Sequence, residues 1–141
     1  GPPWTTGSDG QQPEALEYPF FETSMIQIYG IPTCGSVKKA IAWAREAGVE
    51  FTFHNFRTEA PTDELLSGWL KDIPAAKLAN TAGPTWRKID PEIREAAKAS
   101  PEMLKTLMLS TPLLIKRPVI VWADGSATSG VDEALWKTKS V

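Results

Sequence analysis

The chain has 141 residues, of which 42% are hydrophobic and 23% are charged, a composition typical of a single globular domain with its own core. Its net charge of −2 provides no basic field for nucleic acid or an acidic membrane, and no apolar run reaches the about 20 residues that span a bilayer. The single cysteine cannot form an internal disulfide, so we expect a protein of the reducing cytoplasm. We expect it to be a monomer that binds neither nucleic acid nor membrane.

The composition of the chain changes near Met25. Residues 1–24 are rich in Gly, Pro, Ser, Thr and Gln and follow neither a helical nor a strand period, as disordered segments do. We interpret them as a disordered N-terminal arm, either an addition foreign to the protein or an extension upstream of a natural start at Met25. The predicted folded domain spans residues 25–141.

After the arm, strand and helix patterns alternate. Residues 26–29 are predicted to form a buried strand, 35–47 a helix that ends at Gly48, and 51–56 a second strand with alternating apolar and polar residues. A strand–helix–strand unit of this length predicts a right-handed crossover between two parallel strands.

The middle of the domain is predicted to be helical, and its end to return to the sheet. Helical patterns cover residues 63–70 (after a Thr62 cap), 75–80, 91–99 and 101–110, with a loop at 81–85. A strand, a hairpin turn, a short partner strand and a last helix follow at 119–122, 124–125, 126–129 and 131–137. This order predicts an α/β fold, a thioredoxin-like mixed four-stranded sheet with a helical insertion.

Cys34 lies where the first strand turns into the first helix. A thiol at a helix N-terminus faces unpaired backbone N–H groups and the positive end of the helix dipole. Both favour the thiolate, so the position makes Cys34 a candidate nucleophile. The alternative is that Cys34 is a small buried apolar residue without a chemical role, as most lone cysteines are.

Arg117 and Pro118 precede the third predicted strand. An X–Pro bond at a strand entrance is a candidate for the cis form, which would place the preceding backbone near the turn that carries Cys34. Arg117 would then present planar donors to a carboxylate or an oxyanion. The alternative is that Lys116 and Arg117 are solvated charges that flank a core strand.

Other polar residues have a functional and a structural interpretation. Arg87 is a candidate anion ligand if the helical insertion folds over the sheet, and an exposed loop charge otherwise; Trp86 beside it is either a core residue or a stacking platform. Lys38, one turn into the Cys34 helix, would further favour the thiolate unless it only faces solvent. His54 is interpreted as structural, and because one cysteine and one histidine cannot complete a zinc site, no metal is expected.

Three motifs resemble, in order and spacing, the glutaredoxin-type arsenate reductase family (ArsC), which also contains the Spx regulators. They are Tyr29 to Ala40 (YGIPTCGSVKKA), Asn80-Thr81 with Thr85 to Lys88 (TWRK), and Ile115 to Val119 (IKRPV). The resemblance covers residues 25–141 and is greatest to the YffB-like branch, described as glutathione-dependent thiol reductases. It implies a thioredoxin-like fold with a helical insertion and a cis peptide bond before Pro118.

The resemblance also assigns roles and shows departures. Cys34 matches the family nucleophile, and Arg87 and Arg117 match two of the arginines that surround the oxyanion in arsenate reductases. The third arginine has no counterpart in residues 123–131. The motif histidine is replaced by Gly30, and the second cysteine of the regulators' C-x-x-C pair by Val37. These departures argue against arsenate as the substrate and exclude an internal redox switch.

Without a resolving cysteine, the reductant must come from outside the chain. Glutathione or another small thiol is the expected cosubstrate, with a glutaredoxin as the variant, and no bound cofactor is expected. We predict that its anionic groups bind to Arg117, Arg87 and Lys38. Further contacts are predicted with Gly35 and Ser36 at the start of the helix. The backbone beside Pro118 is expected to pair with an extended thiol peptide.

The leading hypothesis is therefore a thiol oxidoreductase that uses Cys34 alone and glutathione as external reductant. The first alternative is an arsenate reductase coupled to glutathione. The second is a non-catalytic module that binds RNA polymerase, as Spx-type proteins do.

Overall fold

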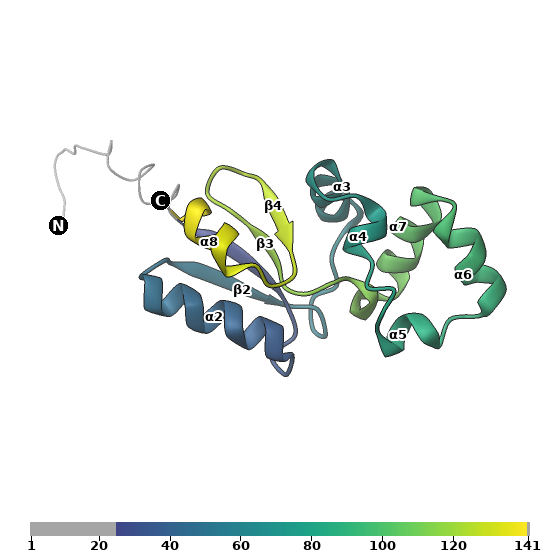
Figure 1. The fold of residues 1–141 in the computed structure, drawn as a ribbon, viewed down its shortest axis with the longest axis horizontal. Helices are drawn as coiled ribbons and strands as arrows, with labels where there is room; N and C mark the ends of the chain where they lie inside the picture. Colours follow the sequence, from purple (N-terminus) through teal and green to yellow (C-terminus); the bar gives the residue numbers. More distant parts are fainter. Residues whose placement is uncertain (1–24, 141) are drawn as a thin grey trace, which may run out of the picture.

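The computed structural model describes residues 25–140 and contains a sheet with the strand order β2-β1-β3-β4. The strands are β1 (Ile26–Gly30), β2 (Phe51–Asn55), β3 (Val119–Val121) and β4 (Ala127–Ser129). β1 is parallel to β2 and antiparallel to β3, and β4 is antiparallel to β3. The predicted thioredoxin-like α/β sheet is confirmed (Figure 1). The arm predicted at residues 1–24 lies outside the described residues.

One face of the sheet is covered by α2 (Gly35–Ala47) and α8 (Glu133–Lys139). α2 forms the predicted crossover between the parallel strands, and Gly48 ends it at φ 71°, a left-handed conformation that favours glycine. Alternate residues of the strands point to this face and join both helices in one buried cluster, whose members are Ile26, Ile28, Ala40, Ala44, Ile120, Trp122 and Trp136.

The other face is covered by α3 (Asp63–Asp72), which Thr62 caps as predicted, by accepting a hydrogen bond from the Leu65 N–H at 3.1 Å. Trp69 of this helix lies edge-on to Tyr29 of β1, with ring centroids 4.9 Å apart. Both side chains are buried, so the pair joins α3 to the centre of the sheet. This core continues without interruption into the helical insertion.

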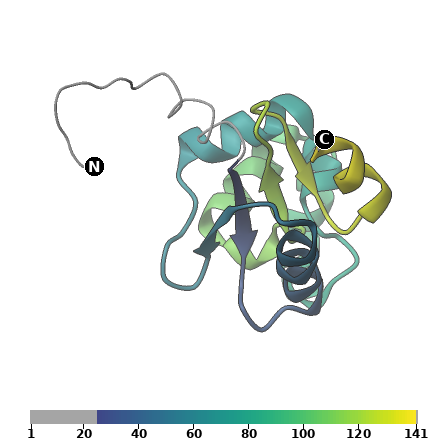
Figure 2. The same cartoon turned by 90° about the vertical axis from the view of Figure 1, so that its left-hand side faces the viewer.

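The insertion lies between α3 and β3. Its elements are α4 (Ala75–Leu78), α5 (Pro84–Arg87), α6 (Pro91–Lys98), α7 (Pro101–Ser110) and the 3-10 helix η2 (Pro112–Leu114). Figure 1 shows α4 to α7 gathered at one end of the molecule, and Figure 2 shows them behind the sheet when the molecule is viewed from the opposite end. Among the described residues, no helix has the length and apolarity needed to cross a bilayer.

Two backbone hydrogen bonds join the start and the end of the insertion. The Asn80 N–H donates to the Leu114 carbonyl at 2.8 Å, and the Lys116 N–H donates to the Leu78 carbonyl at 2.7 Å. They form an isolated antiparallel bridge outside the main sheet. The segment that begins the insertion and the segment that ends it therefore lie side by side.

The structure differs from the local predictions at several points. The segment 81–85 is not entirely a loop, because Pro84 begins α5 and Gly83 is its N-cap; a helix of four residues is too short to show a period. The 3-10 helix η2 was not predicted. The last helix begins at Glu133, after an Asp132 cap, because the Asp132 carboxylate accepts the Leu135 N–H.

Gly30, the last residue of β1, packs directly against Val37 in the first turns of α2. A Cβ at position 30 would collide with a methyl group of Val37, and Val37 is completely buried. The absence of a side chain at position 30 therefore lets α2 approach the end of β1. Gly30 and Val37, two of the positions at which the sequence departs from the motifs that it resembles, lie in contact with each other.

We expect Gly30→Ala to lower the free energy of unfolding by about 1–3 kcal/mol, because the added methyl group overpacks a filled site. Val37→Ala alone should also destabilise the fold, because it leaves a cavity. In the double variant the new methyl group occupies that space, so the two losses should not add. Urea unfolding of the four proteins measures this coupling, and strictly additive losses would show that the two residues do not compete for space.

Candidate functional site

Cys34 is the N-cap residue of α2, with an extended backbone at φ −81° and ψ 128°. Its carbonyl accepts the Lys38 N–H at 3.0 Å, which is the first hydrogen bond of the helix. Its own N–H donates to the Ile31 carbonyl at 3.2 Å. Within the described residues, the sulfur accepts no hydrogen bond from the first turn. The thiol is half-buried and packs against the larger core. Cys34 therefore occupies the N-terminal, positive end of a 13-residue helix.

The pairing of β1 with β3 brings Pro118 to the end of the sheet at which Cys34 lies. Tyr29 is paired with Val119 in an antiparallel register, so the end of β1 lies beside the start of β3. Cys34 follows the end of β1 by a short turn, and Pro118 immediately precedes β3. The Arg117–Pro118 peptide bond is cis, as predicted. Pro118 is completely buried and Arg117 is half-buried.

Arg87, the predicted anion ligand, belongs to the helical insertion. It is the last residue of α5, its side chain is exposed, and its Nη1 donates to the Ala82 carbonyl at 2.9 Å. This bond ties the guanidinium group to the preceding loop and leaves its other N–H groups available to an anion. Trp86 beside it is 4% exposed and belongs to the core, so it is not a stacking platform.

The start of α2 carries the remaining predicted contacts. Gly35 and Lys38 are exposed and Ser36 is half-buried. Lys39 pairs with Glu133 of α8 at 3.9 Å. In the part of the chain that the structure describes, Lys38, Arg87 and Arg117 have no carboxylate partner, and none of them contacts Cys34 through a hydrogen bond or ion pair.

His54 has structural partners. Its Nε2 lies 2.6 Å from Gln27 Oε1, its Nδ1 lies 3.5 Å from a Glu59 carboxylate oxygen, and its ring stacks on Tyr29 with centroids 4.4 Å apart. Burial, and in second place the Glu59 carboxylate, raise the pKa of Tyr29. Glu59 could not be recognised as a partner from the sequence, because it lies in the bend that follows β2. Residues 25–140 contain no group of three potential metal ligands.

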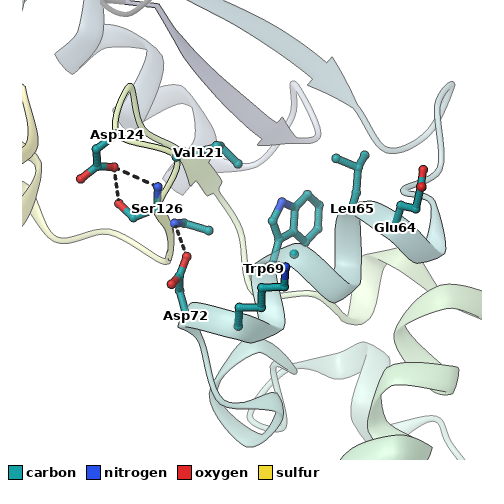
Figure 3. A pocket seen from close by; sticks show the side chains of 11 residues that line it. Glu64, Leu65, Trp69, Asp72, Val121, Asp124 and Ser126 are labelled. Carbon is teal, nitrogen blue, oxygen red and sulfur yellow. Dashed lines mark hydrogen bonds between the residues drawn. The ribbon is translucent and has the colours of Figure 1, made fainter.

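A pocket of about 490 Å³ lies between α3 and the β3–β4 hairpin (Figure 3), and Cys34 is not among its lining residues. β3 starts beside the Cys34 turn and ends at this hairpin, so the two regions lie at opposite ends of the strand. Asp72 closes one wall by accepting the Ala127 N–H at 2.9 Å. Hydrogen bonds from Ser126 lower the pKa of Asp124 to about 2. Both carboxylates are engaged in holding the hairpin, so this pocket is not part of the Cys34 site.

Comparison with known proteins gives a consistent set of relatives. The ArsC family model matches residues 29–138. A solved structure named YFFB is 29% identical, with a TM-score of 0.75, and covers 82% of this chain and 99% of its own. An arsenate reductase (ArsC) related protein from Brucella melitensis is 34% identical, with a TM-score of 0.64, over 81% of this chain and 92% of its own. The global transcriptional regulator Spx 2 of Bacillus anthracis is 26% identical over 69% of this chain and 73% of its own length.

The position of Cys34 predicts an unusual result for its replacement by serine. Serine is a preferred N-cap residue and alanine is not, and the Cys34 sulfur makes no capping hydrogen bond to the described first turn. We expect Cys34→Ser to be more stable than Cys34→Ala by about 1 kcal/mol. Thermal unfolding of both variants measures the difference; equal stabilities would show that the side chain at position 34 does not face the N–H groups of the first turn.

Proposed function

The chain belongs to the ArsC family, and we propose that it is a thiol oxidoreductase that uses Cys34 as its only nucleophile and glutathione as external reductant. One observation carries this proposal: the single cysteine of the sequence is the N-cap of α2, at the edge of the sheet where Arg117 and the cis Pro118 lie. A helix N-terminus favours the thiolate. The reducing cytoplasm is the compartment that this chemistry requires.

The proposed reaction is a cycle of two thiol–disulfide exchanges. The Cys34 thiolate attacks the glutathione sulfur of a mixed disulfide R–S–S–G, forms Cys34–S–S–G, and releases R–S⁻, which takes up a proton. A glutathione thiolate then attacks the glutathione sulfur on the enzyme and releases the Cys34 thiolate together with oxidised glutathione. In sum, one R–S–S–G and one glutathione give R–SH and oxidised glutathione, so atoms and electrons balance.

The basic residues are proposed to bind the anionic groups of glutathione. Arg117 is half-buried, and its planar fork of donors matches a carboxylate. Arg87 keeps N–H groups available beyond its bond to Ala82, and Lys38 adds positive charge at the start of α2. The N–H groups of Gly35 and Ser36 lie in the first turn and have no partner within the helix, so they are proposed to face the sulfur atoms.

Extended thiol substrates are proposed to bind beside Pro118. The chain there enters β3 at the edge that also holds the Cys34 turn, and a backbone segment at the end of a strand can pair with an added extended peptide. Such pairing would hold the disulfide of a peptide substrate in place while its side chains vary. A glutaredoxin that delivers electrons in place of glutathione would use the same backbone.

A second candidate function is arsenate reduction with glutathione as electron donor. It is supported by the similarity to the arsenate reductase related protein and by the two arginines on separate elements. Gly30 stands where the family motif has a histidine, and its contact with Val37 leaves no space for one. Production of arsenite, measured against the Cys34→Ser variant, separates this function from the first. The similarity to Spx 2 supports a third, binding to RNA polymerase, which a pull-down with the polymerase α subunit tests.

We expect the native protein to reduce a glutathionylated model peptide and to carry one glutathione on Cys34 when the reaction is stopped by acid. Replacing Arg117 or Arg87 by glutamine should raise the KM for glutathione about ten-fold each, because a hydrogen bond between charged groups is lost. Steady-state kinetics coupled to the consumption of oxidised glutathione give these values.

Arg94→Gln is the matched control, because it removes an arginine from α6 on the far side of the insertion. Its KM should equal that of the native protein. Activity that persists in Cys34→Ser, or a ten-fold change in Arg94→Gln, would contradict the proposed mechanism.

A further inference from the structure

A second pocket, of about 440 Å³, is lined by Lys116 and by Ala82, whose carbonyl accepts a hydrogen bond from Arg87. It lies between the end of α4 and the outer edge of β4, and its polar lining residues include Lys77, Asn80, Lys116 and Ser129. Lys116 is the neighbour of Arg117 in the chain. The volume is within the range of about 300–1,000 Å³ that is typical of small-molecule sites. We call it the Lys77–Lys116 pocket.

Three oxygen atoms around this pocket accept hydrogen bonds within the fold. Asn80 Oδ1 accepts the Ala82 N–H at 3.2 Å, and the Ala82 carbonyl accepts Arg87 Nη1 at 2.9 Å. The Lys116 carbonyl accepts the Ser129 hydroxyl at 2.7 Å. Ala82, which accepts the Arg87 hydrogen bond, is itself a lining residue, so the loop that holds Arg87 forms part of the pocket wall. These three acceptors therefore already have donors within the fold.

The donors, in contrast, are free. Neither Lys77 nor Lys116 has an ion-pair partner among residues 25–140, and no carboxylate lines the pocket. The Gly130 N–H donates to the Pro118 carbonyl at 2.9 Å. In an antiparallel ladder the preceding N–H, that of Ser129, then points away from β3. The pocket is thus lined by two lysines and by Ser129, whose N–H is not bonded to β3. No Asp or Glu is among its lining residues.

Lys116 is also held in position. A Cβ at Gly130 would lie 3.0 Å from Lys116 Cε and 3.6 Å from Cδ, so the alkyl chain of the lysine lies along the glycine. Gly130 has a φ of 82°, a conformation that favours glycine and leaves this groove open. The ammonium group at its end is therefore directed by packing as well as by charge.

We propose that the Lys77–Lys116 pocket binds a carboxylate of the thiol cosubstrate and selects glutathione over neutral thiols. This inference rests on the proposed thiol oxidoreductase function. Glutathione carries a carboxylate at each end, with the thiol between them. Arg117 and Arg87 hold one carboxylate beside Cys34, and the two lysines hold the other in the adjoining pocket.

The first test compares two thiols that differ in charge. The enzyme is converted to the mixed disulfide of Cys34 with 2-mercaptoethanol, and its reduction is followed with glutathione and, separately, with 2-mercaptoethanol. Lys77→Gln and Lys116→Gln should each lower the rate constant for glutathione about three-fold, and the double variant about ten-fold, a size expected for partly solvated ion pairs. The rate constants for 2-mercaptoethanol should stay within two-fold.

Two control variants accompany this test. Lys98→Gln removes the same charge from an exposed position on α6 and should leave both thiols unaffected. Lys116→Arg retains the positive charge and should keep most of the glutathione rate. Equal losses for both thiols, or no loss for glutathione, would overturn the inference while leaving the proposed function intact. A native protein that forms no mixed disulfide with either thiol would overturn the proposed function.

A binding measurement tests the pocket independently of the reaction. S-methylglutathione, which cannot react, should shift the amide resonances of Asn80, Thr81 and Ser129 in the native protein, and these shifts should be lost in the double lysine variant. Inorganic phosphate is the second arm. If phosphate at the same concentration shifts these resonances as strongly, the pocket binds anions without selecting the cosubstrate, and the inference fails; absence of shifts with S-methylglutathione also overturns it.

Discussion

The antiparallel pairing of β1 with β3 is the constraint on which the proposed site depends. The register of Tyr29 with Val119 places the end of one strand beside the start of the other, although the two lie far apart in the sequence. The turn to Cys34 and the segment with Arg117 and Pro118 therefore lie at the same end of the two central strands. Because both segments are attached directly to buried strands, neither can move far without breaking the core.

The contact between Gly30 and Val37 adds a second constraint at the same edge. It brings the first turns of α2 against the end of β1 and so sets where the helix N-terminus and its Cys34 lie. A side chain at position 30 would collide with Val37, so this arrangement requires glycine at the end of β1. In the proposed reaction, which uses a single thiol, both electrons of each cycle come from an external donor.

The helical insertion contributes the basic groups that a sheet of four short strands could not supply. Its two ends are joined by the bridge between Ala79 and Ile115, which holds the loop carrying Arg87 next to the segment carrying Lys116 and Arg117. The resulting surface has donors from α5, from the end of α4 and from the entrance of β3. The proposed cosubstrate, with a carboxylate at each end, would use both the arginines and the lysines of this surface.

Much of the fold could be predicted from local patterns. The helix that ends at Gly48, the cap at Thr62 and the strand at Val119 each have a signal within a few residues. The cis bond before Pro118 came from the family resemblance. The four-residue helix at Pro84 was missed because it is shorter than the period that reveals helices. The Lys77–Lys116 pocket could not be predicted, because Lys77, Lys116 and Ser129 meet only through tertiary pairing and the pocket's free donors become visible only when its oxygens are seen to be engaged.

The most direct test of the account is a map of amide resonance shifts when glutathione is added to the Cys34→Ser protein, in which no disulfide can form with the chain. The account predicts shifts at Gly35, Ser36, Arg117 and Val119, on the two segments that the β1–β3 pairing brings together. Shifts confined to the pocket between α3 and the β3–β4 hairpin, or no shifts at all, would contradict it.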